Sequence, residues 1–335
     1  LDFTQGSILK KMVLFSLPMF FTNILQTSFQ FIDSLWVGNL LGTAGLGAVS
    51  ISGPIIFTVL AFVIGLNNAT LTVISQARGA KDEKRLKESL NAFVTVNFVL
   101  SIILGLIGFF LAEVILRLMA TPEAILPMAK SYLQIHFLGI VFLFGYNFIG
   151  TVLRALGDSR TPVRFVLLAV VLNTILDPLF IHTFKLGIEG AAYATLVSQG
   201  FAFLYGIIHS IRNKKAPFTV PHIPQFHYFK TIMKLGLPGG LQMMTISAGV
   251  AAIMGIVASF GEDVVAGFGA SQRIDNLIMI PATTLGAAVT SMAGQNIGAL
   301  MWDRVHEIAR KSLILILSVA FSISLLVFLS ADVLI

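Results

Sequence analysis

The stretch MVLFSLPMFFTNILQTSFQFIDSLWVGNLL, residues 12–41, decides how this chain folds. It is apolar almost throughout, and its single charged side chain is Asp33. An ionised carboxylate at the centre of a bilayer costs about 3 kcal/mol on insertion scales. Such a side chain is tolerated when it binds a proton or a cation, or when it faces a water-lined cavity. The stretch therefore predicts a membrane helix whose carboxylate handles ions.

The composition of the whole chain also indicates a membrane protein. Its 335 residues are 56% hydrophobic and 11% charged, whereas soluble domains carry about 25% charged residues. The charges are separated by long neutral runs, and an apolar run of about 20 residues matches the hydrocarbon thickness of a bilayer. The absence of cysteine excludes disulfides, thiol chemistry and cysteine-ligated metals. We expect an all-α polytopic membrane protein with no enzymatic activity and no cofactor.

Nine membrane spans are predicted from the apolar runs. The basic residues gather in alternate loops, and the opposite loops hold only Arg117, Lys130 and Lys185. By the positive-inside rule, the N-terminus and the linker 211–230 lie in the cytoplasm, and the chain lies in the plasma (inner) membrane. The net charge of +6 thus reflects topology, and no nucleic-acid partner is expected. The predicted spans are 10–38, 47–77, 88–115, 128–153, 163–182, 188–210, 231–259, 264–297 and 307–335.

An internal repeat divides the chain. Three short phrases recur in the same order about 220 residues later. They are Leu17-Pro18, matched by Leu237-Pro238; AGLGA at 44–48, matched by AGFGA at 266–270; and SQARGA at 75–80, matched by GQNIGA at 294–299. Six predicted spans separate the copies, so both copies cross the membrane in the same direction, as in transporters with parallel repeats.

The repeat predicts two six-helix lobes. We assign residues 1–210 to an N-terminal lobe, 211–230 to a cytoplasmic linker, and 231–335 to a partial C-terminal lobe. By the repeat period, a chain with a complete second lobe would have about 440 residues in total. We therefore expect twelve helices in the whole fold, of which this chain holds about nine.

Polar side chains in the N-terminal lobe share a depth in the membrane. Asp33 lies ~33 Å along its helix from the basic end of span one, and Asp177 lies ~20 Å along span five. Asn173 stands one helical turn before Asp177 on the same face. Thr195 lies ~12 Å into span six from the outer side. Together they offer the hard oxygen donors that suit a proton or Na⁺.

Several segments resemble the MATE (multidrug and toxic compound extrusion) transporters of the MOP superfamily. These segments are LPMF at 17–20 with the later Asp33, ISQARGA at 74–80, RALGDSRTP at 154–162, RIDNLIMIPATTLG at 273–286 and GQNIGA at 294–299. The resemblance extends over all 335 residues. It implies a V-shaped pair of six-helix lobes that exports amphipathic, often cationic drugs against H⁺ or Na⁺ entry.

The resemblance also implies a site. Its cation-binding positions correspond to Asp33, Asn173, Asp177 and Thr195, and Tyr132 and Asn147 correspond to positions that extend the polar network. Some family members use a carboxylate in span seven. Span seven here has none, and Ile253 stands where the repeat places the counterpart of Asp33, which favours the DinF-like branch with its site in the N-terminal lobe.

Two further hypotheses concern mechanism and substrate. Pro18 removes a backbone hydrogen bond from span one, so protonation of Asp33 could change the bend of this helix and displace the drug. Adaptable aromatic and methionine side chains could line the drug cavity. The candidates are Phe29, Phe144, Phe148, Met243 and Met244; the alternative for each is ordinary packing. The expected partners are small molecules and the lipid bilayer, with the protein a monomer.

Three other functions would also involve intramembrane carboxylates or this superfamily. A lipid-linked oligosaccharide flippase of the same superfamily would have a basic central cavity, but the spans hold almost no Lys or Arg. An intramembrane aspartyl protease would use two aspartates, but FIDSL and TILDPLF lack that family's Y-D and G-x-G-D contexts. A passive channel gives no reason for two carboxylates at one depth.

Overall fold

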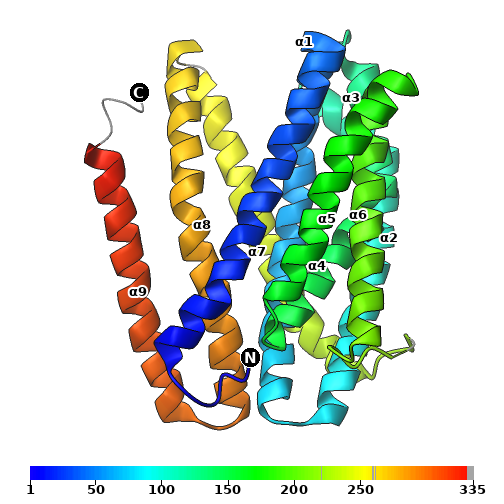
Figure 1. Cartoon of the computed structure of the whole chain (residues 1–335). Helices are drawn as coiled ribbons and strands as arrows, with labels where there is room; N and C mark the ends of the chain where they lie inside the picture. Colours follow the sequence, from blue (N-terminus) through cyan, green and yellow to red (C-terminus); the bar gives the residue numbers. More distant parts are fainter. Residues whose placement is uncertain (220, 259, 261, 330–335) are drawn as a thin grey trace.

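The computed structural model describes residues 1–219, 221–258, 260 and 262–329, and these residues form α-helices and one π-helical turn (Figure 1). This confirms the predicted all-α fold class. In chain order the elements are α1 (Ile8–Gly79), α2 (Glu83–Leu118), α3 (Leu126–Leu138), α4 (Ile140–Ala155), α5 (Arg160–Pro178), the π turn η1 (Leu179–Thr183), α6 (Gly187–Arg212), α7 (Phe226–Ala258), α8 (Glu262–Gly298) and α9 (Trp302–Leu329).

Helix α1 contains two predicted spans. Its 72 residues would be far longer than a bilayer is thick if they were straight. The helix turns back at Gly42, whose φ of 67° and ψ of −159° suit glycine because it has no Cβ. The predicted spans 10–38 and 47–77 are therefore the two halves of α1, which we call its first half and its second half.

The lengths and apolarity of the helices are those of a multi-pass membrane protein. Within the described residues, six helices are long and apolar enough to cross a bilayer, and the α3–α4 pair adds a seventh if it forms one span. The predicted span 128–153 is this pair, which bends by 49°. Gly139 lies at the break, and a Cβ there would collide with the side chain of Leu196 on α6. Helix α8, which the sequence predicts as the eighth span, is not one of these six helices.

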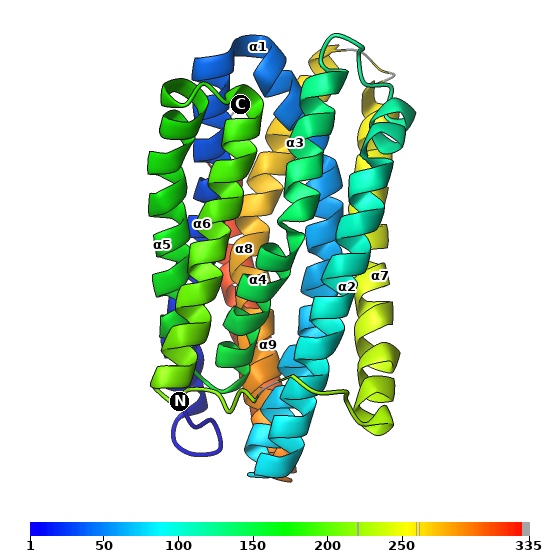
Figure 2. The same ribbon diagram turned by 90° about the vertical axis from the view of Figure 1, so that its right-hand side faces the viewer.

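The helices run along one direction, and their connections gather at the two ends of the bundle. We call the end that holds the loops 80–82, 156–159 and 299–301 the basic end; it is at the bottom of Figure 1. There the first half of α1 begins beside α8, and the two ribbons diverge toward the opposite end. Figure 2 shows the segment between α6 and α7 crossing the basic end.

Asp158 explains why the RALGDSRTP phrase ends one helix and begins the next. Gly157 adopts a φ of +87°. Asp158 then accepts hydrogen bonds from the backbone N–H groups of Arg160 and Thr161, which begin α5, and from the Thr161 hydroxyl. Burial opposes ionisation of this carboxyl, but the hydrogen bonds from Thr161 and Lys215 bring its pKa below the usual value. Asp158 thereby ties the segment after α6 to the start of α5.

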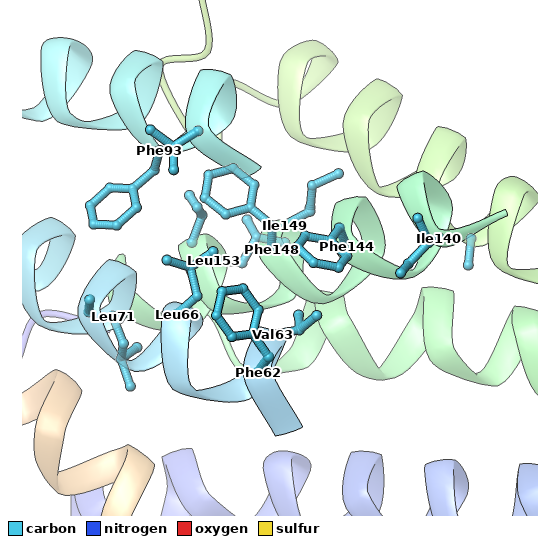
Figure 3. Packing of buried hydrophobic residues seen from close by; sticks show 14 of the residues in the cluster. Phe62, Val63, Leu66, Leu71, Phe93, Ile140, Phe144, Phe148, Ile149 and Leu153 are labelled. Atoms are coloured by element: carbon cyan, nitrogen blue, oxygen red, sulfur yellow. The ribbon is translucent and has the colours of Figure 1, made fainter. Parts of the chain in front are cut away.

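The main core lies between the second half of α1, α2 and α4. Phe62, Leu66, Phe93 and their neighbours interlock there (Figure 3). Helices in lipid gain little from hydrophobic transfer, so close van der Waals packing of this kind holds them together. Phe144 and Phe148 belong to this core and are only 1% and 4% exposed. The prediction that they line a drug cavity is therefore wrong for this conformation, because their rings are enclosed by core side chains.

Two glycines join the halves of the repeat by reciprocal contacts at the basic end. A Cβ on Gly79 would collide with the backbone carbonyl of Gln295, and a Cβ on Gly298 would collide with that of Gln76. Gly79 and Gly298 are equivalent positions of the SQARGA and GQNIGA phrases, as are Gln76 and Gln295. The two copies therefore meet through matching surfaces, as a parallel repeat requires.

Hydrogen bonds join α8 to the N-terminal part of the chain in the same region. We call this set of contacts the basic-end contact. Helix α4 ends at Ala155, and its last carbonyls lack partners within the helix. Ser291 Oγ donates to the Arg154 carbonyl at 2.8 Å, and Gln295 Nε2 donates to the Ala155 carbonyl at 2.9 Å. Asn296 Nδ2 donates to the Phe3 carbonyl at 3.1 Å. Side chains of α8 thus satisfy backbone acceptors of the N-terminal part of the chain.

Candidate functional site

Five buried polar side chains meet near the end of the bundle opposite the basic end. They come from the first half of α1, from α3, from α5 and from α6. We call them the oxygen cluster: Asp33, Tyr132, Asn173, Asp177 and Thr195. Asp33 is 6% exposed and Asp177 is fully buried. Every one of these residues was predicted from the sequence, and the structure brings them together.

Two hydrogen-bonded groups make up the oxygen cluster. Tyr132 OH donates to Asp33 Oδ2 at 3.3 Å. Asn173 Nδ2 donates to Asp177 Oδ1 at 3.0 Å and to Thr195 Oγ1 at 3.4 Å. Asp33 and Asp177 also lie close enough to interact electrostatically. The carboxylates therefore belong to one site rather than to two separate helix contacts.

Three oxygen atoms in this cluster have no hydrogen-bond partner among the residues that the structure describes. They are Asp33 Oδ1, Asn173 Oδ1 and Asp177 Oδ2. An unpaired buried acceptor costs roughly 1–3 kcal/mol, and more if it is charged. Three such atoms on neighbouring side chains are the donor set that a proton or a small hard cation would satisfy.

Positive side chains do not balance the carboxylates. Within the described residues, the hydrogen bonds and ion pairs of Asp33 and Asp177 include no Lys or Arg. The described residues also hold no group of three His, Cys, Asp or Glu side chains that would bind a transition metal. A cation here would instead be held by two carboxylates together with neutral amide and hydroxyl oxygens.

The end of α5 explains the position of Asp177. Asn173 and Asp177 share a helix face because they are one turn apart. The helical conformation does not stop at Pro178, the last residue of α5, but continues in the π turn Leu179–Thr183. A Cβ on Gly190 of α6 would collide with the backbone of Phe180, so α6 approaches this turn closely. That approach brings Thr195, which lies further along α6, within reach of Asn173.

Asn147 does not join the oxygen cluster. Its Nδ2 donates to the Leu143 carbonyl of its own helix at 2.8 Å. The predicted extension of the network through Asn147 is therefore not seen, because the amide satisfies itself on α4. Its neighbour Tyr146 makes the contact between helices instead, accepting a hydrogen bond from Gln26 Nε2 at 2.7 Å.

Sequence reasoning missed a ring contact beside the oxygen cluster and a hydrogen bond further along α1. His136 lies one turn after Tyr132, and the centroids of the two rings are 4.3 Å apart. Asn23 Nδ2 donates to Thr284 Oγ1 at 2.8 Å, which links the first half of α1 to α8. The four-residue spacing could have indicated His136. The Asn23–Thr284 bond joins positions far apart in the sequence, and no local pattern indicates it.

The remaining cavity candidates differ in exposure. Phe29 is half-buried and packs against the main core. On α7, Met243 is half-buried and Met244 is exposed. Their predicted role in binding a drug stays a prediction.

The fold and the buried site define a polytopic helical membrane protein with an internal parallel repeat. The MatE family model matches residues 18–179 and 238–335, on both sides of the segment between α6 and α7. The chain belongs to the MATE family. Members of this family are membrane transporters and not enzymes, so the aspartyl-protease alternative is set aside.

The chain is similar to several known sequences and solved structures. It is 59% identical over 297 residues to "Probable multidrug resistance protein YpnP" of Bacillus subtilis, covering 89% of this chain and 67% of that protein. A MATE protein crystallised in a bent conformation matches with a TM-score of 0.91 at 25% identity, covering 99% of this chain and 75% of that one. A MATE protein in a straight conformation matches with a TM-score of 0.89 at 25% identity, covering 98% and 74%.

Proposed function

We propose that this chain is a cation-coupled antiporter that exports amphipathic, often cationic organic compounds. H⁺ is the first choice of coupling ion and Na⁺ the alternative. The observation that carries the proposal is the pair of buried carboxylates, Asp33 and Asp177, on different helices, each with an oxygen atom that no hydrogen bond satisfies among the described residues. The relative YpnP is described as a probable multidrug resistance protein, which supports the substrate class.

The proposed orientation places the basic end in the cytoplasm of the plasma membrane, with the N-terminus on the same side. This follows the positive-inside rule, since the loops at this end carry most of the Lys and Arg. The oxygen cluster then lies in the outer half of the bilayer. The basic-end contact closes the inner side, while α1 and α8 diverge toward the outer side, as in an outward-facing state (Figure 1).

The proposed roles of the two lobes follow from the internal repeat. Residues 1–210 act as the lobe that holds the coupling site, 211–230 act as a cytoplasmic linker, and 231–335 belong to the second lobe. Ile253 replaces a carboxylate at the position equivalent to Asp33. The protein works as a monomer, and its placement in the DinF-like branch follows from the missing carboxylate in α7.

The proposed cycle exchanges a cation for a drug. From the outer side, a proton binds Asp33 or Asp177 and relieves the repulsion between the two carboxylates. The pair then carries one negative charge instead of two and attracts a cationic drug less strongly, so the drug leaves outward. Once the inner side opens, the proton dissociates where H⁺ is scarcer. The ionised pair then attracts the next cationic substrate.

Efflux of a fluorescent cationic dye from cells expressing the protein tests this proposal. Collapse of the proton gradient alone is expected to slow efflux at least about tenfold. Collapse of the sodium gradient alone is expected to leave it nearly unchanged; the reverse pattern would identify Na⁺ as the coupling ion. Cells that do not express the protein provide the background rate. Efflux that is insensitive to both gradients would reject antiport.

Pro18 is proposed to let the first half of α1 bend when the cluster gains a proton. Pro18→Ala restores the backbone donor that proline lacks, and so stiffens the helix. We expect dye efflux to fall about tenfold with expression unchanged. Pro54→Ala, in the second half of the same helix, is the matched control and should retain most of the activity. Equal effects of the two substitutions would contradict a specific role for Pro18.

A further inference from the structure

A pocket of about 350 Å³ opens on the surface between the first half of α1 and the start of α5. Its walls are Leu17, Pro18 and Phe21 from α1, and Arg160, Val163 and Arg164 from α5. It lies outside the oxygen cluster, and the transport cycle described above does not use it. Pro18, at which α1 is proposed to bend, forms one wall of the pocket.

The α5 side of the pocket is positively charged. Arg160 and Arg164 are one helical turn apart, so their side chains share a face. Both are exposed, and neither belongs to an ion pair among the described residues. The nearby Asp158 carboxylate is already engaged by Thr161 and Lys215. The two guanidinium groups are therefore available for an anion, and guanidinium matches phosphate geometry well.

The α1 side of the pocket is apolar. Leu17 and Phe21, one turn apart, are 53% and 52% exposed. The pocket thus combines a charged rim near the basic end with an apolar wall that extends toward the bilayer centre. That combination matches an amphiphile with an anionic head and a hydrocarbon tail.

We propose that this pocket binds one anionic phospholipid of the cytoplasmic leaflet, with its phosphate held by Arg160 and Arg164 and an acyl chain lying against Leu17 and Phe21. The choice of leaflet rests on the orientation given under the proposed function. Anionic lipids are the partners that exposed basic residues meet at that surface. The bound lipid touches Pro18 and so stabilises one bend of α1, which makes transport dependent on anionic lipid.

Lipid binding is measured without transport, so its failure is distinguishable from failure of the antiport proposal. The purified protein in mild detergent is titrated with phosphatidylglycerol or phosphatidylcholine, and bound lipid is counted by native mass spectrometry. We expect tight retention of one phosphatidylglycerol. The double variant Arg160→Gln/Arg164→Gln should bind it about 10- to 30-fold more weakly. Inorganic phosphate alone should not bind detectably.

The control is Lys84→Gln/Arg85→Gln, which removes the same charge from exposed residues at the start of α2. It should bind phosphatidylglycerol like the unmodified protein. Leu17→Trp fills the pocket without changing charge and should also weaken retention. Equal loss in both charge variants, or equal retention of both lipids, would overturn the proposal. In proteoliposomes, a dye-efflux rate that is equal with and without phosphatidylglycerol would overturn the link to Pro18.

Discussion

Replacing Asp33 by Asn is expected to reduce gradient-driven export to the background rate, a loss of at least about 100-fold. Asn has nearly the same shape as Asp, and Tyr132 can still donate a hydrogen bond to its amide oxygen. The amide cannot take up and release a proton, however, and it carries no charge to attract a cation. Transport by purified protein in liposomes, driven by an imposed pH gradient, measures this loss. Full proton-driven export by Asp33→Asn would remove Asp33 from the coupling role.

Asp177→Asn provides the companion experiment. If both carboxylates hold one cation, each single variant should lose nearly all coupling, and the double variant should be little worse than either. Such non-additivity is typical of residues that act as a unit. Asn147→Ala is the matched control, because the Asn147 amide bonds only within α4. Its activity should stay within about twofold of the unmodified protein. Additive partial losses would instead indicate two independent sites.

Gly79→Ala is expected to force open the basic-end contact. The added Cβ would meet the backbone carbonyl of Gln295, which cannot rotate away as a flexible side chain would. Overpacking of this kind costs about 1–3 kcal/mol. Gly298→Ala, the equivalent change in the other copy, should have the same effect. The protein should then spend more time open to the cytoplasm.

A cysteine reporter measures this opening, since the chain has no cysteine of its own. Ala288 is fully buried in the hydrophobic cluster that joins α1 to α8. In Ala288→Cys, a membrane-impermeant thiol reagent added at the cytoplasmic side should react slowly. Adding Gly79→Ala should speed the reaction about tenfold. Gly286→Ala is the control, because a Cβ there meets nothing within 4 Å. Unchanged labelling with Gly79→Ala would mean that this contact does not hold the inner side closed.

The sequence predicted the oxygen cluster well because its members obey simple spacing rules. Asn173 and Asp177 are one helical turn apart, and distances along the spans placed Asp33 at a similar depth. The resemblance to MATE transporters added Tyr132. The all-α fold was also recognisable from the composition and the apolar runs, and the family from several short motifs.

Other features depended on tertiary packing, which local patterns do not encode. The break at Gly139, where Leu196 of α6 leaves no room for a Cβ, depends on a neighbouring helix, so the fourth predicted span was given as one continuous segment. Phe144 and Phe148 looked like cavity residues, but whether an aromatic face meets a cavity or a core depends on the neighbouring helices. Asn147 was expected to extend the polar network, but its amide bonds its own helix, and spacing alone does not distinguish these two possibilities.

The basic-end contact predicts where mutations that open the inner side of the protein should occur. Its donors are side chains of α8, whereas its acceptors on the N-terminal side are backbone carbonyls of Phe3, Arg154 and Ala155. Every residue type supplies a carbonyl, so side-chain substitutions at those three acceptor positions leave the hydrogen bonds in place. Loss-of-closure alleles that act through these hydrogen bonds should therefore accumulate at Ser291, Gln295 and Asn296.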